Sequence, residues 1–321
     1  MAETLLEIRD LNVRYTTDGI IARAVNHVDL NIEAGEIFGL VGETGAGKTT
    51  IALASMGLLP RYTSQVEGSI KFKGREIAGA NENVLRDIRG KNISMIFQDP
   101  MTSLNPVFPV GTQIGDVIKW HNKSLSKAEV ETQVDEILKM VGIAPERKRE
   151  YPHQFSGGMK QRVMIAIAIV CKPDLLIADE PTTALDVTIQ AQVMMTMRNL
   201  QKQLGSSVLL ITHDLGLVAM FCDKVSVLYG GEIVEHGALE DIFDNSRSHH
   251  PYTVGLFGSL PDLHSRASRL NPIAGLMPHP AELPAGCKFH PRCPERMEKC
   301  QTGEVGASSS GTHSIKCHLF A

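Results

Sequence analysis

Apolar and polar residues alternate along the chain in two kinds of segment. Short uninterrupted apolar runs have the length of buried strands, and they occupy residues 37–41, 93–97, 175–178 and 208–212. Longer segments with helical periodicity separate these runs. The alternation predicts a largely parallel β-sheet covered by helices on both faces, which is an α/β fold.

The pattern changes in the middle and near the end of the chain. Residues 110–141 read as an amphipathic helix, a polar turn at 121–126 and a second amphipathic helix, which predicts a helical subdomain within about 98–162. From Pro261 the chain is rich in Pro, Ser, His and Gly before four closely spaced cysteines. We therefore expect a main domain over 1–260 and a separate extension over 261–321.

The charge and the hydropathy of the chain argue against two classes of protein, namely nucleic-acid binders and membrane-spanning or secreted proteins. The 321 residues carry 32 basic and 36 acidic side chains, a formal charge of −4, which argues against a dedicated nucleic-acid binder. The first ten residues, MAETLLEIRD, are acidic rather than basic and apolar, and no window approaches ~18 uninterrupted apolar residues. We therefore expect a protein made in the cytosol, without signal peptide or transmembrane segment.

A glycine-rich segment after the first strand is the strongest chemical signal. It fits G-x-x-x-x-G-K-[ST], follows a strand and opens a helix, as a phosphate loop requires; its residues are Gly42, Glu43, Thr44, Gly45, Ala46, Gly47, Lys48 and Thr49, followed by Thr50. Backbone N–H groups and the helix N-terminus would attract a polyphosphate. Lys48 would reach the β- and γ-phosphates and Thr49 would ligate magnesium. A glycine-rich turn with a chance lysine, the alternative, does not account for the flanking strand and helix.

Polar residues follow two of the later strands. Asp179 is placed to hold magnesium and Glu180 to activate the water that attacks the γ-phosphorus, although such a pair alone is usually a helix cap or a solvated turn. His213 follows the run 208–212. From there its imidazole could bond the γ-phosphate, while periodicity alone favours an ordinary strand-end histidine.

The segment 155–162, Phe-Ser-Gly-Gly-Met-Lys-Gln-Arg, resembles the signature sequence of ABC ATPases and follows the family's order of motifs. Ser156, Gly157 and Gly158 would cap a helix over 159–171 and offer a second anion-binding corner. The resemblance implies a P-loop NTPase (RecA-like) core with an antiparallel β subdomain. It also implies a head-to-tail dimer in which each signature covers the partner's ATP.

The resemblance extends to further positions. It implies that Gln98 senses magnesium and the γ-phosphate, that the loop 184–186, ending in Asp186, crosses the dimer interface, and that His213 is the switch histidine. Tyr15 is similar to the aromatic residue that stacks on adenine, with a strand-core tyrosine as the alternative. Departures from the commoner family residues remove no phosphate-binding group; they are Thr44, Ala46, Phe155 and Met159.

Two segments resemble the peptide-importer group of ABC ATPases, namely 98–106 (Gln-Asp-Pro-Met-Thr-Ser-Leu-Asn-Pro) and 250–253 (His-Pro-Tyr-Thr). The likeness covers the whole chain. It implies an ATPase that powers import of dipeptides, oligopeptides or related cargo such as nickel chelates or glutathione.

Four of the six cysteines lie in the last 35 residues, separated by five, six and sixteen residues; they are Cys287, Cys293, Cys300 and Cys317. A reducing compartment disfavours disulfides, and the spacing is wider than the paired knuckles of structural zinc. Long loops suit a [4Fe-4S] cluster, which the peptide-importer likeness also implies. We expect a [4Fe-4S] cluster, with zinc and free thiols as the alternatives. Cys171 and Cys222 are expected to be small core residues.

The family likeness also implies partners and a location. The partners would be a second ATPase subunit, a paralogue rather than an identical copy, and two transmembrane permease subunits whose coupling helix enters the helical subdomain. An extracytoplasmic binding protein would capture the cargo. The chain would lie on the cytoplasmic face of the inner membrane and bind no nucleic acid. The alternatives are a soluble ABC ATPase of DNA repair or translation, and an iron-sulfur sensor with structural ATP.

Overall fold

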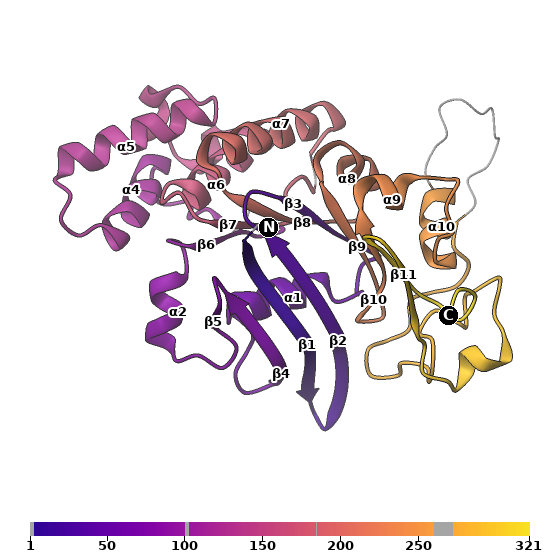
Figure 1. Ribbon diagram of the computed structural model, residues 1–321. Helices are drawn as coiled ribbons and strands as arrows, with labels where there is room; N and C mark the ends of the chain where they lie inside the picture. The colour runs from indigo at the N-terminus through magenta and orange to yellow at the C-terminus, as the bar shows by residue number, and fades with distance from the viewer. Residues whose placement is uncertain (1–2, 100–102, 184, 260–271) are drawn as a thin grey trace. The chain divides into compact units, whose positions relative to one another are not determined.

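The computed structural model describes residues 3–99, 103–183, 185–259 and 272–321 (Figure 1). Two compact units contain them. Within the described ranges, the first unit comprises residues 3–5, 32–37 and 80–211, and the second comprises 6–31, 38–79 and 212–321. Both units are therefore assembled from segments that are distant in the sequence.

Parallel strands form the base of the first unit, namely β6 Ile93–Ile96, β7 Leu175–Asp179 and β8 Ser207–Thr212. β7 lies between the other two, with Ile177 opposite both Met95 and Leu209. Every residue of the three strands is buried, which explains why they are continuous apolar runs rather than alternating ones. The prediction of these strands is confirmed, each end lying within one residue of the expected position.

Helices complete the first unit. α4 Val110–His121 and α5 Lys127–Met140 pack side by side (Figure 1) and confirm the predicted helical pair. α5 begins at a capping box, in which Ser126 and Glu129 bond each other's backbone N–H groups. The remaining elements are α2 Glu82–Ile88, η1 Pro145–Arg149, η2 Pro152–Gln154, α6 Gly157–Ile169 and α7 Val187–Leu204.

The second unit contains an antiparallel sheet of four strands, as the family resemblance implied. Their order is β2 Ile20–Glu33, β1 Thr4–Thr17, β4 Ser64–Phe72 and β5 Arg75–Glu76. β1 buries alternate residues because one face of the sheet packs inward. A register shift between Arg9 and Asn12 changes the phase of this alternation, so that both Ile8 and Val13 are buried.

A second set of strands in this unit includes the tail. β3 Ile37–Val41 pairs in parallel with β9 Lys224–Tyr229, and β10 Glu232–Ala238 pairs antiparallel with β9. β12 His313–Lys316 adds to β10, with Ile315 opposite Glu235, and β11 Ala307–Ser310 adds to β12. The predicted boundary at 260/261 lies outside the described residues. The other elements are α1 Lys48–Ser55, α8 Leu215–Phe221, α9 Leu239–Phe243, α10 Pro251–Gly258 and η3 Glu298–Gln301.

None of the helices in the described ranges has the length and apolar character that crossing a bilayer requires. Cys222 is buried, as predicted, and burial raises the pKa of its thiol to about 12. Cys171 is only half-buried, because it lies at the C-terminal end of α6 and not inside the helix packing. The prediction of a core position for Cys171 is therefore wrong.

Candidate functional site

The phosphate loop follows β3 closely because two of its glycines contact neighbouring backbone. A Cβ atom on Gly42 would lie 2.2 Å from the carbonyl oxygen of Leu228, and one on Gly47 would lie 2.4 Å from that of Ala24. Gly47 also has a φ of 109°, a left-handed value that side chains disfavour. It forms the N-cap of α1. The loop thus leads directly into a helix N-terminus, where anions bind.

Lys48 is held by the loop to which it belongs. Its Nζ atom donates to the carbonyl oxygens of Gly42 (2.7 Å) and Glu43 (3.0 Å), and the residue is only 5% exposed. The loop residues around it are exposed, namely Thr44, Gly45 and Thr49. A fixed ammonium group beside an accessible threonine hydroxyl suits phosphate oxygens and magnesium. These residues therefore fit MgATP.

Tyr15 lies beside the same helix. It is half-buried on β1, and its hydroxyl is 3.5 Å from Oγ1 of Thr50 in α1. Val13, two residues earlier on the same face of β1, is fully buried, so Tyr15 continues the buried face of the strand at the point where it becomes partly exposed. The exposed part of its ring is compatible with stacking on a base, and stacking stays a prediction.

The two carboxylates after β7 have different surroundings. Asp179 ends the strand and is 2% exposed, whereas Glu180 is half-buried. Oε2 of Glu180 accepts hydrogen bonds from Nε2 of Gln98 (3.0 Å) and from Oγ1 of Thr183 (3.0 Å). The structure thus brings Gln98 and Glu180 together from the carboxyl ends of the paired strands β6 and β7. Sequence reasoning missed Thr183, although it follows Glu180 in the same turn.

The backbone of Glu180 is strained. Its φ is 46°, in the left-handed region that costs a residue with a side chain roughly 1–2 kcal/mol. Its N–H donates to the carbonyl of Ile211 in β8 (2.8 Å). The hydrogen bonding between β7 and β8 therefore extends to Glu180, although its backbone has left the extended conformation of the strand. Backbone strain of this kind is concentrated at functional sites, which supports the catalytic interpretation of Glu180.

The signature segment forms a helix cap, as predicted. Oγ of Ser156 accepts a hydrogen bond from the N–H of Met159 (3.4 Å), and α6 begins at Gly157. The helix starts two residues earlier than predicted, so the glycines form its first turn. A Cβ atom on Gly158 would lie 2.5 Å from Cγ2 of Ile189 in α7. Ser156 and Gly157 are exposed, which leaves this anion-binding corner accessible.

Two other predicted residues occupy exposed positions. Asp186 precedes α7 directly, at its N-cap; Ala184, in the same predicted loop, lies outside the described residues. His213 is exposed between β8 and α8. The residue after it, Asp214, caps α8 by accepting from two backbone N–H groups. His213 is therefore accessible, and its contact with phosphate stays a prediction.

The predicted nucleotide residues are divided between the two units. Tyr15, the phosphate loop and His213 belong to the second unit, whereas Gln98, the carboxylates, the signature and Asp186 belong to the first. Within the units, Tyr15 reaches the loop helix and Gln98 reaches Glu180. The assembly of both sets around one nucleotide stays a prediction.

Glu43 is held by two residues that no motif had indicated. Arg292 donates from Nη1 and Nη2 to the Glu43 carboxylate (2.8 and 3.1 Å). The hydroxyl of Tyr252 accepts from the Glu43 N–H (2.9 Å). Tyr252 is fully buried, and burial raises the pKa of its hydroxyl. Tyr252 lies in the segment 250–253 and Arg292 lies next to Cys293, but neither position in the sequence pointed to the phosphate loop.

The tail cysteines influence one another. Cys300 and Cys317 are buried, Cys287 and Cys293 are half-buried, and the N–H of Cys287 donates to the carbonyl of Cys300 (3.0 Å). Burial and the neighbouring thiols raise the pKa of Cys293 to about 11, and they also raise the pKa of Cys287 and Cys317. Thiols of this kind ionise when a soft metal binds them. Binding of a metal by these four cysteines stays a prediction.

A second group with metal-ligand chemistry is found among the described residues. It consists of Glu235, His249 and His313, whose ligand atoms all lie within 4.8 Å of one another. Oε1 of Glu235 is 2.7 Å from Nδ1 of His249 and 2.8 Å from Nε2 of His313, and Oε2 accepts from the His250 N–H (2.8 Å). These hydrogen bonds satisfy the buried carboxylate without an ion.

Comparison with known proteins identifies two family matches. Residues 25–183 match the family described as ABC transporter, and residues 234–300 match the C-terminal region of oligopeptide/dipeptide transporters. The chain is 46% identical to the dipeptide transport ATP-binding protein DppD of Bacillus subtilis (strain 168), over 99% of this chain and 95% of that protein. It is 48% identical to the oligopeptide transport ATP-binding protein OppD of Salmonella typhimurium (strain LT2), over 93% of this chain and 89% of that protein.

Solved structures share the fold. CbiO1 from Clostridium perfringens, part of the ABC transporter complex cbiONQ, aligns with a TM-score of 0.66 and 30% identity, over 76% of this chain and 92% of that chain. The dimeric post-hydrolysis structure of the ATP-binding cassette MJ0796, bound to ADP and Pi, aligns with a TM-score of 0.65 and 26% identity, over 73% and 98%. These matches confirm the predicted fold class.

Proposed function

Because this chain belongs to the ABC transporter family, among the ATP-binding proteins of oligopeptide and dipeptide transporters, we propose that it hydrolyses MgATP to power the import of peptides or related cargo. The hydrogen bond between Gln98 and Glu180 carries the proposal. It places a candidate base at the carboxyl end of a parallel strand, where ligands of α/β sheets bind. The names of DppD and OppD support peptides as the cargo.

Each predicted residue has a role in this reaction. Lys48 and the loop N–H groups bind the β- and γ-phosphates. Thr49 and Asp179 would hold magnesium, which would neutralise charge on the transferred phosphoryl group. Glu180 orients and deprotonates the attacking water. The supporting residues are Tyr15 at adenine, Gln98 at magnesium and water, and His213 at the γ-phosphate.

A substitution at Glu180 tests the catalytic proposal. Glu180→Gln keeps the size of the side chain but removes its basicity, so we expect ATP to bind with unchanged affinity while turnover falls at least roughly 100-fold. Phosphate release and equilibrium binding of a fluorescent ATP analogue measure the two quantities. Glu146→Gln, on an exposed residue of the same unit, is the matched control. Equal turnover of Glu180→Gln and the wild type would refute the proposal.

The exposed signature corner supports a dimer. Ser156 and Gly157 are accessible, and their helix cap can bind a phosphate presented by another subunit. The similar cassette MJ0796 is dimeric in its ADP and Pi complex. The proposed partner is a second ATPase subunit, a paralogue by family likeness.

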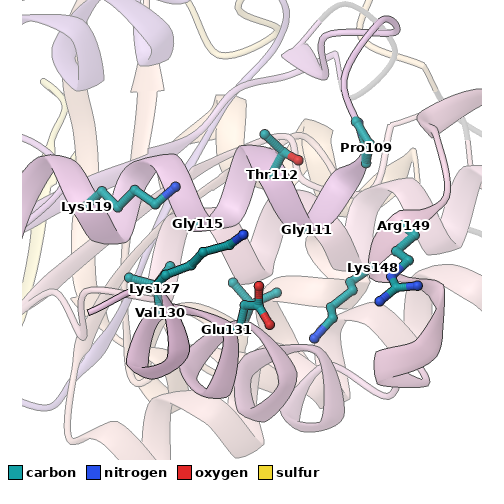
Figure 2. Close-up of a pocket in the computed structure, with 11 residues that line it drawn as sticks. Pro109, Gly111, Thr112, Gly115, Lys119, Lys127, Val130, Glu131, Lys148 and Arg149 are labelled. Carbon is teal, nitrogen blue, oxygen red and sulfur yellow. The ribbon is translucent and has the colours of Figure 1, made fainter. Parts of the chain in front are cut away.

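A hollow of about 270 Å³ between α4, α5 and η1 is the proposed docking site for the permease (Figure 2). Its lining includes four basic side chains and one acidic one, namely Lys119, Lys127, Lys148, Arg149 and Glu131. Val107 and Phe108, just before α4, are 69% and 50% exposed. An apolar helix with acidic residues at its end would match this surface, and we propose that the coupling helix of the permease is such a helix.

The tail cysteines are proposed to bind a [4Fe-4S] cluster. A single tetrahedral zinc ion would hold four sulfurs about 3.8 Å apart, whereas a cubane separates its cysteines by placing each on its own iron. The sequence separates the four cysteines by five, six and sixteen residues, wider than the paired cysteines of structural zinc sites. This spacing supports the cluster over zinc. When bound, the cluster would tie four positions of the tail together.

The proposed location is the cytoplasmic face of the inner membrane. There the chain would bind two permease subunits, and an extracytoplasmic binding protein would deliver the cargo. The family likeness to transport ATP-binding proteins supports this arrangement.

A further inference from the structure

Arg292 links the cysteine tail to the phosphate loop through a bidentate ion pair with Glu43. Its Nη1 and Nη2 atoms lie 2.8 and 3.1 Å from the two carboxylate oxygens of Glu43, 249 residues earlier in the chain. In this bidentate geometry the planar guanidinium fixes both the orientation of the Glu43 carboxylate and its distance from Arg292. The side chain of Arg292 is 7% exposed and that of Glu43 is 28% exposed, so solvent screens the pair only weakly.

The other contacts of Arg292 hold it in place. Nε donates to the carbonyl of Ala274 (2.9 Å), and Nη2 is 3.5 Å from the carbonyl of Ile273. Nη1 is 3.4 Å from the hydroxyl of Tyr229, whose ring centre is 5.8 Å from the guanidinium carbon. A side chain bonded through every nitrogen has little freedom. Arg292 is therefore a fixed support for Glu43.

Glu43 is also bonded through its backbone. Its N–H donates to the Tyr252 hydroxyl (2.9 Å), and its carbonyl accepts from Nζ of Lys48 (3.0 Å). Lys48 is the residue expected to bind the phosphates. A displacement of Glu43 would therefore move an acceptor that orients the Lys48 ammonium, and small errors in the position of such a group are costly.

The tail loop that carries Arg292 is anchored in the same unit. Phe289 is 1% exposed, and its ring centre lies 5.1 Å from that of Tyr229 and 5.4 Å from that of Tyr252. Cys287 and Cys293 flank this loop. The packing of Phe289 and the bonds of Arg292 thus connect the cysteine tail with β9, α10 and the start of the phosphate loop.

We propose that Arg292 is a positioning residue for nucleotide binding, which holds the first turn of the phosphate loop through Glu43 so that Lys48 meets the phosphates. The inference rests on the proposed ATPase function of the loop and adds that the tail supports it. An ion pair that only stabilised the fold would lower the melting temperature without changing nucleotide affinity. The two roles are therefore separable by experiment.

The test compares Arg292→Gln, Glu43→Gln and the double variant with the wild type. We expect each single variant to raise the Kd of a fluorescent ATP analogue and the KM for ATP about tenfold, which is about 1.4 kcal/mol, while kcat at saturating ATP changes less than about threefold. The double variant should resemble the single ones, because both remove the same interaction. Arg296→Gln, on an exposed arginine of the same tail, should keep the wild-type Kd.

Circular dichroism and thermal melting accompany the binding measurements. If Arg292→Gln does not fold, Glu43→Gln decides the matter, because it breaks the same pair without altering the tail. A folded variant of either residue with Kd and KM within about twofold of the wild type would overturn the inference. If the wild type, assembled with its second ATPase subunit, binds the analogue but does not hydrolyse ATP, the proposed function alone is refuted, since the binding measurement still tests Arg292.

Discussion

Thr183 and Gln98 are neutral groups that hold the carboxylate of Glu180, the proposed catalytic base. Both donate to Oε2 of Glu180 at 3.0 Å, and neither brings a positive charge that would compete with magnesium for the carboxylate. Hydrogen bonds to a charged oxygen are stronger than those between neutral groups. Hydrogen bonds from Gln98 and Thr183 thus orient the side chain of Glu180.

Removal of the Thr183 hydroxyl should slow turnover. Thr183→Val keeps the shape of the side chain but loses a hydrogen bond to a charged group, worth about 1.5–3 kcal/mol. We expect kcat to fall roughly tenfold, with an unchanged KM for ATP, in a steady-state phosphate-release assay. Thr183→Ser retains the hydroxyl and is the control. Equal kcat values for the valine and serine variants would exclude a role for this bond.

At element scale, Glu235 joins three segments of the second unit. It lies on β10, contacts His313 on β12, and accepts bonds from His249 and His250 just before α10. Its side chain is fully buried. Nε2 of His249 also lies 2.9 Å from the carbonyl of Asp244, so both ring nitrogens of His249 have polar partners. A buried carboxylate between two imidazoles therefore holds the tail strand on the sheet.

Neutralising Glu235 should destabilise the second unit. Glu235→Gln removes the negative charge that accepts these hydrogen bonds, and a hydrogen bond to a charged group contributes about 1.5–3 kcal/mol. We expect a markedly lower denaturant midpoint in equilibrium unfolding monitored by circular dichroism. Glu240→Gln, on the exposed side of α9, should leave the midpoint unchanged. A Glu235→Gln midpoint equal to that of the control would show that the network contributes no stability.

At the scale of the whole molecule, the cysteine tail is part of the second unit and not a free appendage. β12 pairs with β10, and Arg292 reaches Glu43 in the phosphate loop. Loops of low intrinsic order need such links because they bury little apolar surface of their own. A metal cluster would add to them by fixing four positions at once.

Anaerobic purification tests the cluster. We expect a brown protein with about four irons per chain and an absorbance band near about 400 nm, since four thiolates with long spacers suit a cubane. Cys300→Ser, which removes a buried ligand, should lose most of the iron and the band. Cys171→Ser should keep both. Stoichiometric zinc without the band would refute the iron-sulfur assignment.

Short sequence motifs are sufficient to predict those parts of the site whose residues are neighbours in the chain. The phosphate loop, the strand before it, the carboxylates at the end of β7 and the Ser156 cap are each encoded within about ten residues, and each was predicted. The start of α6 was misplaced because the glycines at 157 and 158 have low helix propensity. Gly158 is needed there because a Cβ atom at this position would lie 2.5 Å from Cγ2 of Ile189 in α7.

The sequence by itself determined the α/β class, the phosphate-binding chemistry and the family, because periodicity and short motifs reflect local backbone preferences. Only the tertiary structure decided that Thr183 fixes Glu180, that Glu235 holds the tail strand, and that Arg292 reaches Glu43 across 249 residues of chain. The residues in each of these contacts are not related by the helix or strand repeat. Only the folding of the chain brings them within hydrogen-bond distance, so a local sequence pattern cannot predict the contacts.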